Sequence, residues 1–183
     1  MIIEKYLDGN ENLPIDIDYI LYLNNIDVIE MEPNLLPQVE GNNIYGRISI
    51  LGSPDKKFEA IIQIPNNLGS TMRRFVLAHE FAHYVMIKQN PIHILLQKND
   101  FSYLICDKKQ DEDEIVCDIF AEFLLLPPNE IRELIGNYIR AKNNSNKELN
   151  INEFFMYLCK KAQIPLYVAI NSFNHFKQLP KEE

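Results

Sequence analysis

Several features that assign a chain to a common class are missing from these 183 residues. No apolar run approaches the ~18 consecutive residues that a membrane helix needs. The first residues, MIIEKYLDGNENLP, carry an acid at position 4 and no apolar segment of signal-peptide length. Internal repeats and low-complexity segments are also missing. We therefore expect a cytoplasmic protein with no membrane association.

Excess positive charge and closely spaced cysteines are lacking too. The net charge of −8 and pI near 5.1 argue against a protein that binds nucleic acid by neutralising phosphates. Cys106, Cys117 and Cys159 include no CxxC pair, which predicts reduced and mostly buried thiols. What the chain does have is 46% hydrophobic and 24% charged residues, which indicates a globular protein with a real core.

The pattern of apolar residues predicts an α+β protein whose strands come before most of its helices. A turn-forming GSPDK segment predicts that the second and third strands form an antiparallel hairpin. We expect strands at 26–32, 44–51 and 57–65, and helices at 15–25, 71–88, 129–141, 151–163 and 166–176. A further helix should begin near residue 111 and end at LLLPP, residues 124–128. Asn129 is the expected cap of the helix that it begins.

Two histidines and a glutamate stand in the apolar run FVLAHEFAHYVM, residues 75–86. On a helix His79 and His83 lie about 40° apart, with Cβ atoms roughly 5–6 Å from each other. Two imidazoles so placed can bind one ion, and Glu80, about 60° further round, can reach a water on that ion as a general base. The alternative is a pair of core histidines satisfied by hydrogen bonds. The complete H-E-x-x-H pattern on a helix favours the metal site.

A catalytic zinc takes three protein ligands, so a third must come from elsewhere. The pattern H-E-x-x-H-x-x-G-x-x-H would require glycine and histidine at positions that hold Met86 and Gln89, which excludes it. His93, beyond the helix, is one remaining source. The acidic segment DEDEIVCDIFAEFLLLP is the other, because Glu114 and Asp118 share a helix face about 40° apart. One of these carboxylates could bind the metal and the other could accept the N–H of a ligand histidine.

The remaining acids of this segment are weaker candidates. Asp111 and Glu112 fit a helix N-terminus, where negative charge complements the helix dipole. Glu122 lies at the edge of the Glu114 face and has no assigned role.

The segments RRFVLAHEFAHYVM (73–86) and EIVCDIFAEFLLLP (114–127) together resemble the ImmA/IrrE family of metallopeptidases. That family has an arginine-led HExxH helix followed by a helix of the form E-x-x-(A)-(N/D)-x-F-A-x-x-L-L-x-P. In this chain Glu114 follows His83 by 31 positions. The similarity covers residues 44–128 best.

The resemblance implies zinc ligands at His79, His83 and Glu114, a catalytic carboxylate at Glu80, and a supporting role for Asp118 behind the ligands. It also implies a zincin-like domain, similar to gluzincins, with a small twisted sheet on the HExxH helix and a mainly helical C-terminal half. One departure is Cys117, where the family usually has alanine.

We expect a single metallopeptidase domain over residues 1–183. Residues 1–70 would form a helix-and-sheet region, 71–128 the metal-site helices and 129–183 a helical subdomain. By resemblance, the function is that of a zinc-dependent bacterial endopeptidase that cleaves or inactivates a helix-turn-helix transcriptional repressor in a stress or mobile-element response.

Two other functions stay open. The chain could be a non-catalytic, metal-bound regulator that binds a repressor. Residues 151–176 could instead form a helix-turn-helix, although the second of these helices has few basic residues.

The sequence does not choose the residue that stabilises the oxyanion. The possible donors are Tyr84, Arg73, His175 and Tyr167. Arg73 and Arg74 stand in the first turn of their helix, where positive charge is unfavourable, so we expect an acidic partner for them, such as the cluster at 111–114.

Overall fold

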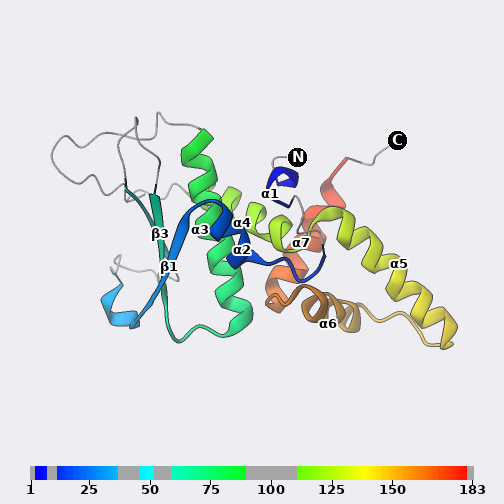
Figure 1. Ribbon diagram of the computed structural model, residues 1–183. Coiled ribbons are helices and arrows are strands. Elements are labelled where there is room, and N and C mark those ends of the chain that lie inside the picture. The colour runs from blue at the N-terminus through cyan, green and yellow to red at the C-terminus, as the bar shows by residue number, and fades with distance from the viewer. Residues whose placement is uncertain (1–2, 8–11, 37–45, 52–58, 90–110, 181–183) are drawn as a thin grey trace. The chain divides into compact units, whose positions relative to one another are not determined.

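A computed structural model describes residues 3–7, 12–36, 46–51, 59–89 and 111–180 (Figure 1). The chain divides into two compact units. One comprises residues 16–121 and the other residues 1–15 together with 122–183. The division falls within helix α4 (Asp111–Leu125). Because a three-stranded sheet is combined with several helices, the predicted α+β class is confirmed.

The sheet belongs to the unit of residues 16–121. Its strands are β1 (Ile26–Met31), β2 (Arg47–Leu51) and β3 (Glu59–Pro65), in the order β1-β3-β2. The predicted antiparallel pairing of β2 with β3 is confirmed, with Ile48 opposite Ile62. β1 pairs in parallel with the other side of β3, so that β3 is the central strand. Its residues Ile62 and Ile64 are completely buried, as expected for a strand paired on both sides.

Helix α3 (Ser70–Gln89) contacts both β2 and β3, and α2 (Ile17–Leu23) contacts α3 and β1 (Figure 1). The α3 sequence is apolar nearly all round, and Leu77, Phe81 and Val85 are at most 2% exposed. A helix of this kind is stable only when it is covered on more than one side. The HExxH helix therefore lies in the core of its unit, as its sequence predicts.

The start of α3 is tied to its neighbours by Arg73. Its guanidinium forms ion pairs with Asp18 of α2 at 2.9 Å and Glu30 of β1 at 2.8 Å. The hydrogen bond with Asp18 raises the pKa of Arg73, and burial opposes that rise. The expected acidic partner of Arg73 is therefore confirmed, but it does not come from the cluster at 111–114. Its partners are the carboxylates that α2 and β1 bring to the first turn of α3.

The second unit contains α1 (Glu4–Leu7), α5 (Pro128–Asn144), α6 (Ile151–Ala162) and α7 (Leu166–Gln178). Helices α5, α6 and α7 contact one another around aromatic rings, with Phe154 5.3 Å from Tyr138 and 5.6 Å from Phe173 between ring centroids. The described part of this unit contains helices and no strands, as predicted for the C-terminal half. None of the helices in the described ranges is long and apolar enough to cross a membrane.

The expected cap at Asn129 is wrong. The N-cap of helix α5 lies two residues earlier, at Pro127, with Pro128 at the first helical position. Proline suits that position because its missing N–H would have no partner inside the helix and its φ is already helical.

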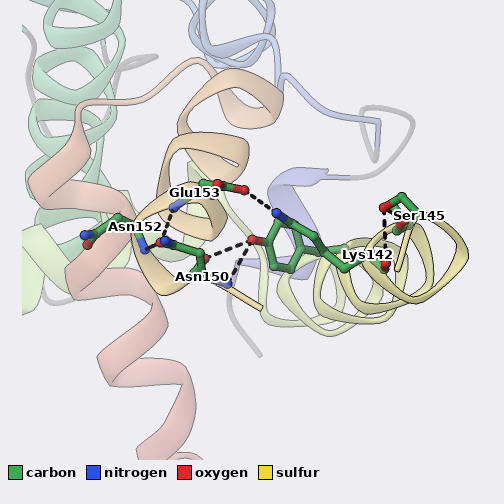
Figure 2. Close-up of polar contacts among 7 residues, drawn as sticks. Lys142, Ser145, Asn150, Asn152 and Glu153 are labelled. Carbon is green, nitrogen blue, oxygen red and sulfur yellow. Dashed lines mark hydrogen bonds and ion pairs between the residues drawn. The ribbon is translucent and has the colours of Figure 1, made fainter. Parts of the chain in front are cut away.

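The connection from α5 to α6 is held by polar contacts (Figure 2). The side-chain oxygen of Asn150 accepts the backbone N–H groups of Asn152 at 2.9 Å and Glu153 at 3.2 Å, which caps α6. Tyr138 of α5 donates its hydroxyl to the carbonyl of Asn150 at 2.9 Å, and Lys142 forms an ion pair with Glu153. These contacts fix the point at which the chain turns from one helix into the next.

Candidate metal centre

Three side chains from α3 and α4 meet at one point. His79 and His83, four residues apart on α3, place their Nε2 atoms 3.1 Å from each other. Glu114, in the first turn of α4, places Oε2 3.2 Å from Nε2 of His79 and Oε1 3.2 Å from Nε2 of His83. Within the described part of the chain, these residues form a group whose ligand atoms all lie within 4.8 Å of one another.

The spacing of these atoms fits a metal ion. Zinc binds imidazole nitrogen at about 2.0–2.1 Å, so two nitrogens on one tetrahedral ion lie about 3.3–3.4 Å apart. The observed separations of 3.1 and 3.2 Å are close to that value. Two imidazoles and one carboxylate form a donor set that takes zinc and also accepts Mn²⁺ or Fe²⁺. The residues present therefore fit a divalent metal with an open coordination position.

Asp118 stands behind the group, one turn after Glu114 on α4. Its Oδ1 lies 2.8 Å from Nδ1 of His79, the ring nitrogen that faces away from Glu114. A carboxylate in this place accepts the Nδ1 proton and leaves the lone pair of the ring on Nε2. The sequence left open which of the two carboxylates faces the Nε2 atoms of both histidines. In the structure that residue is Glu114.

Glu80 is a buried carboxylate that is not among the three convergent side chains. It is 4% exposed and sits against Gly46, the residue before β2. A Cβ at Gly46 would lie 2.9 Å from Oε1 of Glu80, 3.0 Å from its Cγ and 2.6 Å from Cγ1 of Val76. The backbone of Gly46 therefore forms part of the wall that fixes where the Glu80 side chain lies.

Gly46→Ala is expected to displace Glu80 without touching a metal-facing atom. If Glu80 is the general base that the sequence pattern predicts, the reaction that it serves should slow at least about tenfold, since proton transfer requires hydrogen-bond reach, while zinc content stays at the wild-type level. Gly69→Ala is the matched control, because a Cβ there meets nothing within 4 Å. The measurements are the rate at which the wild type and each variant turn over the same substrate, and the amount of zinc that each protein binds. Unchanged turnover in Gly46→Ala would show that Glu80 does not depend on this contact.

The ring of His79 has a raised pKa. Burial lowers the pKa of His79, but hydrogen bonds to Asp118 and Glu114 and the nearby charge of Glu80 outweigh it and raise the pKa from 6.5 to about 9. At neutral pH the ring is thus protonated and faces a carboxylate from each nitrogen. This pairing stabilises the metal-free fold below pH 6.5, and the contribution is lost as the pH rises through 9.

Metal binding should therefore release a proton. Because a metal competes with the proton on His79, the apparent zinc association constant should rise about tenfold per pH unit between neutrality and the His79 pKa near 9. Chelator competition at a series of pH values measures this slope. In Asp118→Asn the rise should end at a lower pH, because one of the groups that raises the pKa has lost its charge. A flat profile in the wild type would contradict the proposed competition.

The possible oxyanion donors differ in burial and in the contacts that they make. Arg73 is held by its two ion pairs, and the ring of Tyr84, 3% exposed, stacks on Phe81. Tyr167 is 45% exposed. His175 donates from Nδ1 to Oε2 of Glu122 at 2.6 Å, in the unit of residues 1–15 and 122–183.

Sequence reasoning missed this His175–Glu122 pair. Glu122, to which the sequence pattern assigns no role, is 1% exposed and is the buried hydrogen-bond acceptor of His175. Its 53-residue separation from His175 left no local signal. His93, the alternative third ligand, and Cys106 lie outside the described residues. The two described cysteines, Cys117 and Cys159, are thiols outside any disulfide, and Cys117 is buried.

Comparison with known proteins adds a family to this geometry. The family model for peptidase M78, described as the IrrE N-terminal-like domain, matches residues 45–160. The match includes both helices of the centre and more than half of the chain. No curated protein sequence matches the chain significantly. The sequence resemblance is confirmed, and the chain belongs to the ImmA/IrrE family of peptidases.

Proposed function

We propose that this protein is a zinc-dependent endopeptidase whose metal is held by His79, His83 and Glu114. The observation that carries the proposal is the convergence of two histidine Nε2 atoms and a carboxylate at 3.1–3.2 Å, on an HExxH helix, in a chain of a peptidase family. A zinc ion bound there would supply Lewis-acid chemistry, polarising the scissile carbonyl and lowering the pKa of a water.

Glu80 is the general base in this proposal. Its carboxylate takes the proton of the attacking water and passes it to the amine that leaves when the peptide bond breaks. Burial keeps the carboxylate away from bulk solvent, and Gly46 restricts the space into which it can turn. Asp118 orients His79 by accepting its Nδ1 proton, which leaves Nε2, the nitrogen beside Glu114, to bind the metal.

The proposed substrate is a helix-turn-helix transcriptional repressor, cleaved or otherwise inactivated in a stress or mobile-element response. Its support is the family to which the chain belongs, because the resemblance implies that substrate class. Such a substrate would be met in the cytoplasm. The acidic character of the chain is consistent with a protein substrate and gives no sign of direct nucleic-acid binding.

Cells that produce wild-type protein or Glu80→Gln provide the test. Comparison of protein N-termini in the two cultures should reveal new N-termini only with the wild type, among them one within a DNA-binding repressor. The purified repressor should then be cut in vitro by the wild type plus zinc. If Glu80→Gln relieves repression as well as the wild type does and neither produces a new N-terminus, the chain is instead a non-catalytic regulator that acts by binding.

A further inference from the structure

Asp118 supports His79 from behind, and the structure also places a partner behind His83. Sγ of Cys117, the residue before Asp118 on α4, lies 3.3 Å from Nδ1 of His83. The same sulfur lies 3.4 Å from Sδ of Met86 on α3, to which its S–H donates. Cys117 is fully buried and His83 is 5% exposed, so little solvent competes for these contacts.

Hydrogen-bond chemistry sets the direction of this chain of contacts. A thioether has no proton and can only accept, so Cys117 is the donor in its contact with Met86. The lone pairs of the Cys117 sulfur can then accept a proton from His83. In a neutral ring with its proton on Nδ1, the lone pair is on Nε2, the atom that faces Glu114 at 3.2 Å.

We propose that Cys117 and Met86 together are the positioning residues of His83, and hold it in the tautomer with the proton on Nδ1 and an unprotonated Nε2. Nδ1–H of His83 donates to Cys117, and S–H of Cys117 donates to Met86. The inference rests on the proposed function insofar as that function makes Nε2 of His83 a metal ligand. The tautomer itself is a property of the metal-free protein.

The two histidines are thus supported in different ways. His79 faces the charged oxygen of Asp118 at 2.8 Å, whereas His83 faces a neutral sulfur at 3.3 Å. Hydrogen bonds to an ionised partner are about twice as strong as those between neutral groups. Cys117 therefore orients its ring without adding another negative charge beside Glu114 and Asp118. Cys117 meets the Nδ1 edge of His83, which makes it a partner of the ligand rather than a ligand.

The test reads the tautomer directly. In metal-free protein with ¹⁵N-labelled histidine, at a pH where the His83 ring is neutral, NMR should show the proton of His83 on Nδ1. Cys117→Ala should populate the Nε2–H form, and Cys117→Ser should restore Nδ1–H, because a hydroxyl can accept and donate as the thiol does. Met86→Leu keeps a similar volume but removes the acceptor, so it should shift the tautomer in part. Cys159→Ala is the control and should change nothing.

Zinc affinity gives a second readout. Loss of a residue that is hydrogen-bonded to a metal ligand lowers metal affinity by about 10–100-fold. We expect a loss of zinc affinity in this range for Cys117→Ala, and recovery of the affinity in Cys117→Ser. Wild-type His83 with its proton on Nε2, or an unchanged Nδ1–H form in Cys117→Ala, would overturn the inference even if zinc binds. If the tautomer responds as expected and no variant binds zinc, the inference stands and the proposed peptidase function fails.

Discussion

Glu80→Gln should abolish peptide-bond cleavage and leave the metal in place. The amide has nearly the shape of the carboxylate but cannot take a proton from water, and loss of a general base lowers turnover by about 10²–10⁴. Glu80 is not one of the three convergent side chains, so zinc affinity should stay within about threefold of the wild type. Turnover of the proposed repressor substrate and a zinc titration on the same samples measure both effects.

The control for this variant is Glu112→Gln, which removes the same charge from an exposed position near the start of α4. It should retain full turnover and full zinc binding. If Glu80→Gln cleaves as fast as Glu112→Gln, the general base is a different residue. If Glu80→Gln loses zinc, Glu80 helps to hold the metal and its assigned role is wrong.

Glu114→Ala should cause the largest loss of metal affinity among substitutions on α4. It removes the carboxylate that lies 3.2 Å from both ligand nitrogens, whereas Asp118→Ala removes a contact to the far side of one ring. Outer partners of metal ligands are worth about 10–100-fold in affinity. Glu114→Ala should exceed that range, Asp118→Ala should fall within it, and Glu112→Ala should bind as the wild type does. Competition with a chromophoric zinc chelator gives the three constants.

The order of these constants is the informative result. Equal losses in Glu114→Ala and Asp118→Ala would mean that neither carboxylate is distinguished as a ligand. Full zinc binding by Glu114→Ala would remove it as the third ligand. His93 or an acid at 111–113 would then be tested next.

The parts of the centre that are predictable from sequence depend on helix periodicity. Side chains at i and i+4 share a face in any helix, so His79 pairs with His83, and Glu114 with Asp118, on spacing alone. The antiparallel pairing of β2 with β3 is also accessible, because turn-forming residues join two nearby strands. In each case the relevant residues are close in sequence or fixed by one repeating geometry.

Contacts between distant segments cannot be predicted in the same way. β1 pairs with β3 across more than 30 residues, and no local pattern states which strand it joins or in which direction. Arg73 meets Asp18 at a separation of 55 residues for the same reason. The contact of Cys117 with His83 depends on how α3 and α4 pack, although its position beside Asp118 in the sequence is a usable hint. Packing between elements decides these contacts.

X-ray absorption at the zinc edge is the most direct test of the central claim that His79, His83 and Glu114 hold the metal. Wild-type protein purified without added metal and then loaded with one equivalent of zinc is the sample. We predict a first shell of nitrogen and oxygen at about 2.0–2.2 Å with two imidazoles and no sulfur. A sulfur shell near 2.3 Å, as a thiolate ligand gives, or failure to retain zinc at all, would contradict the account.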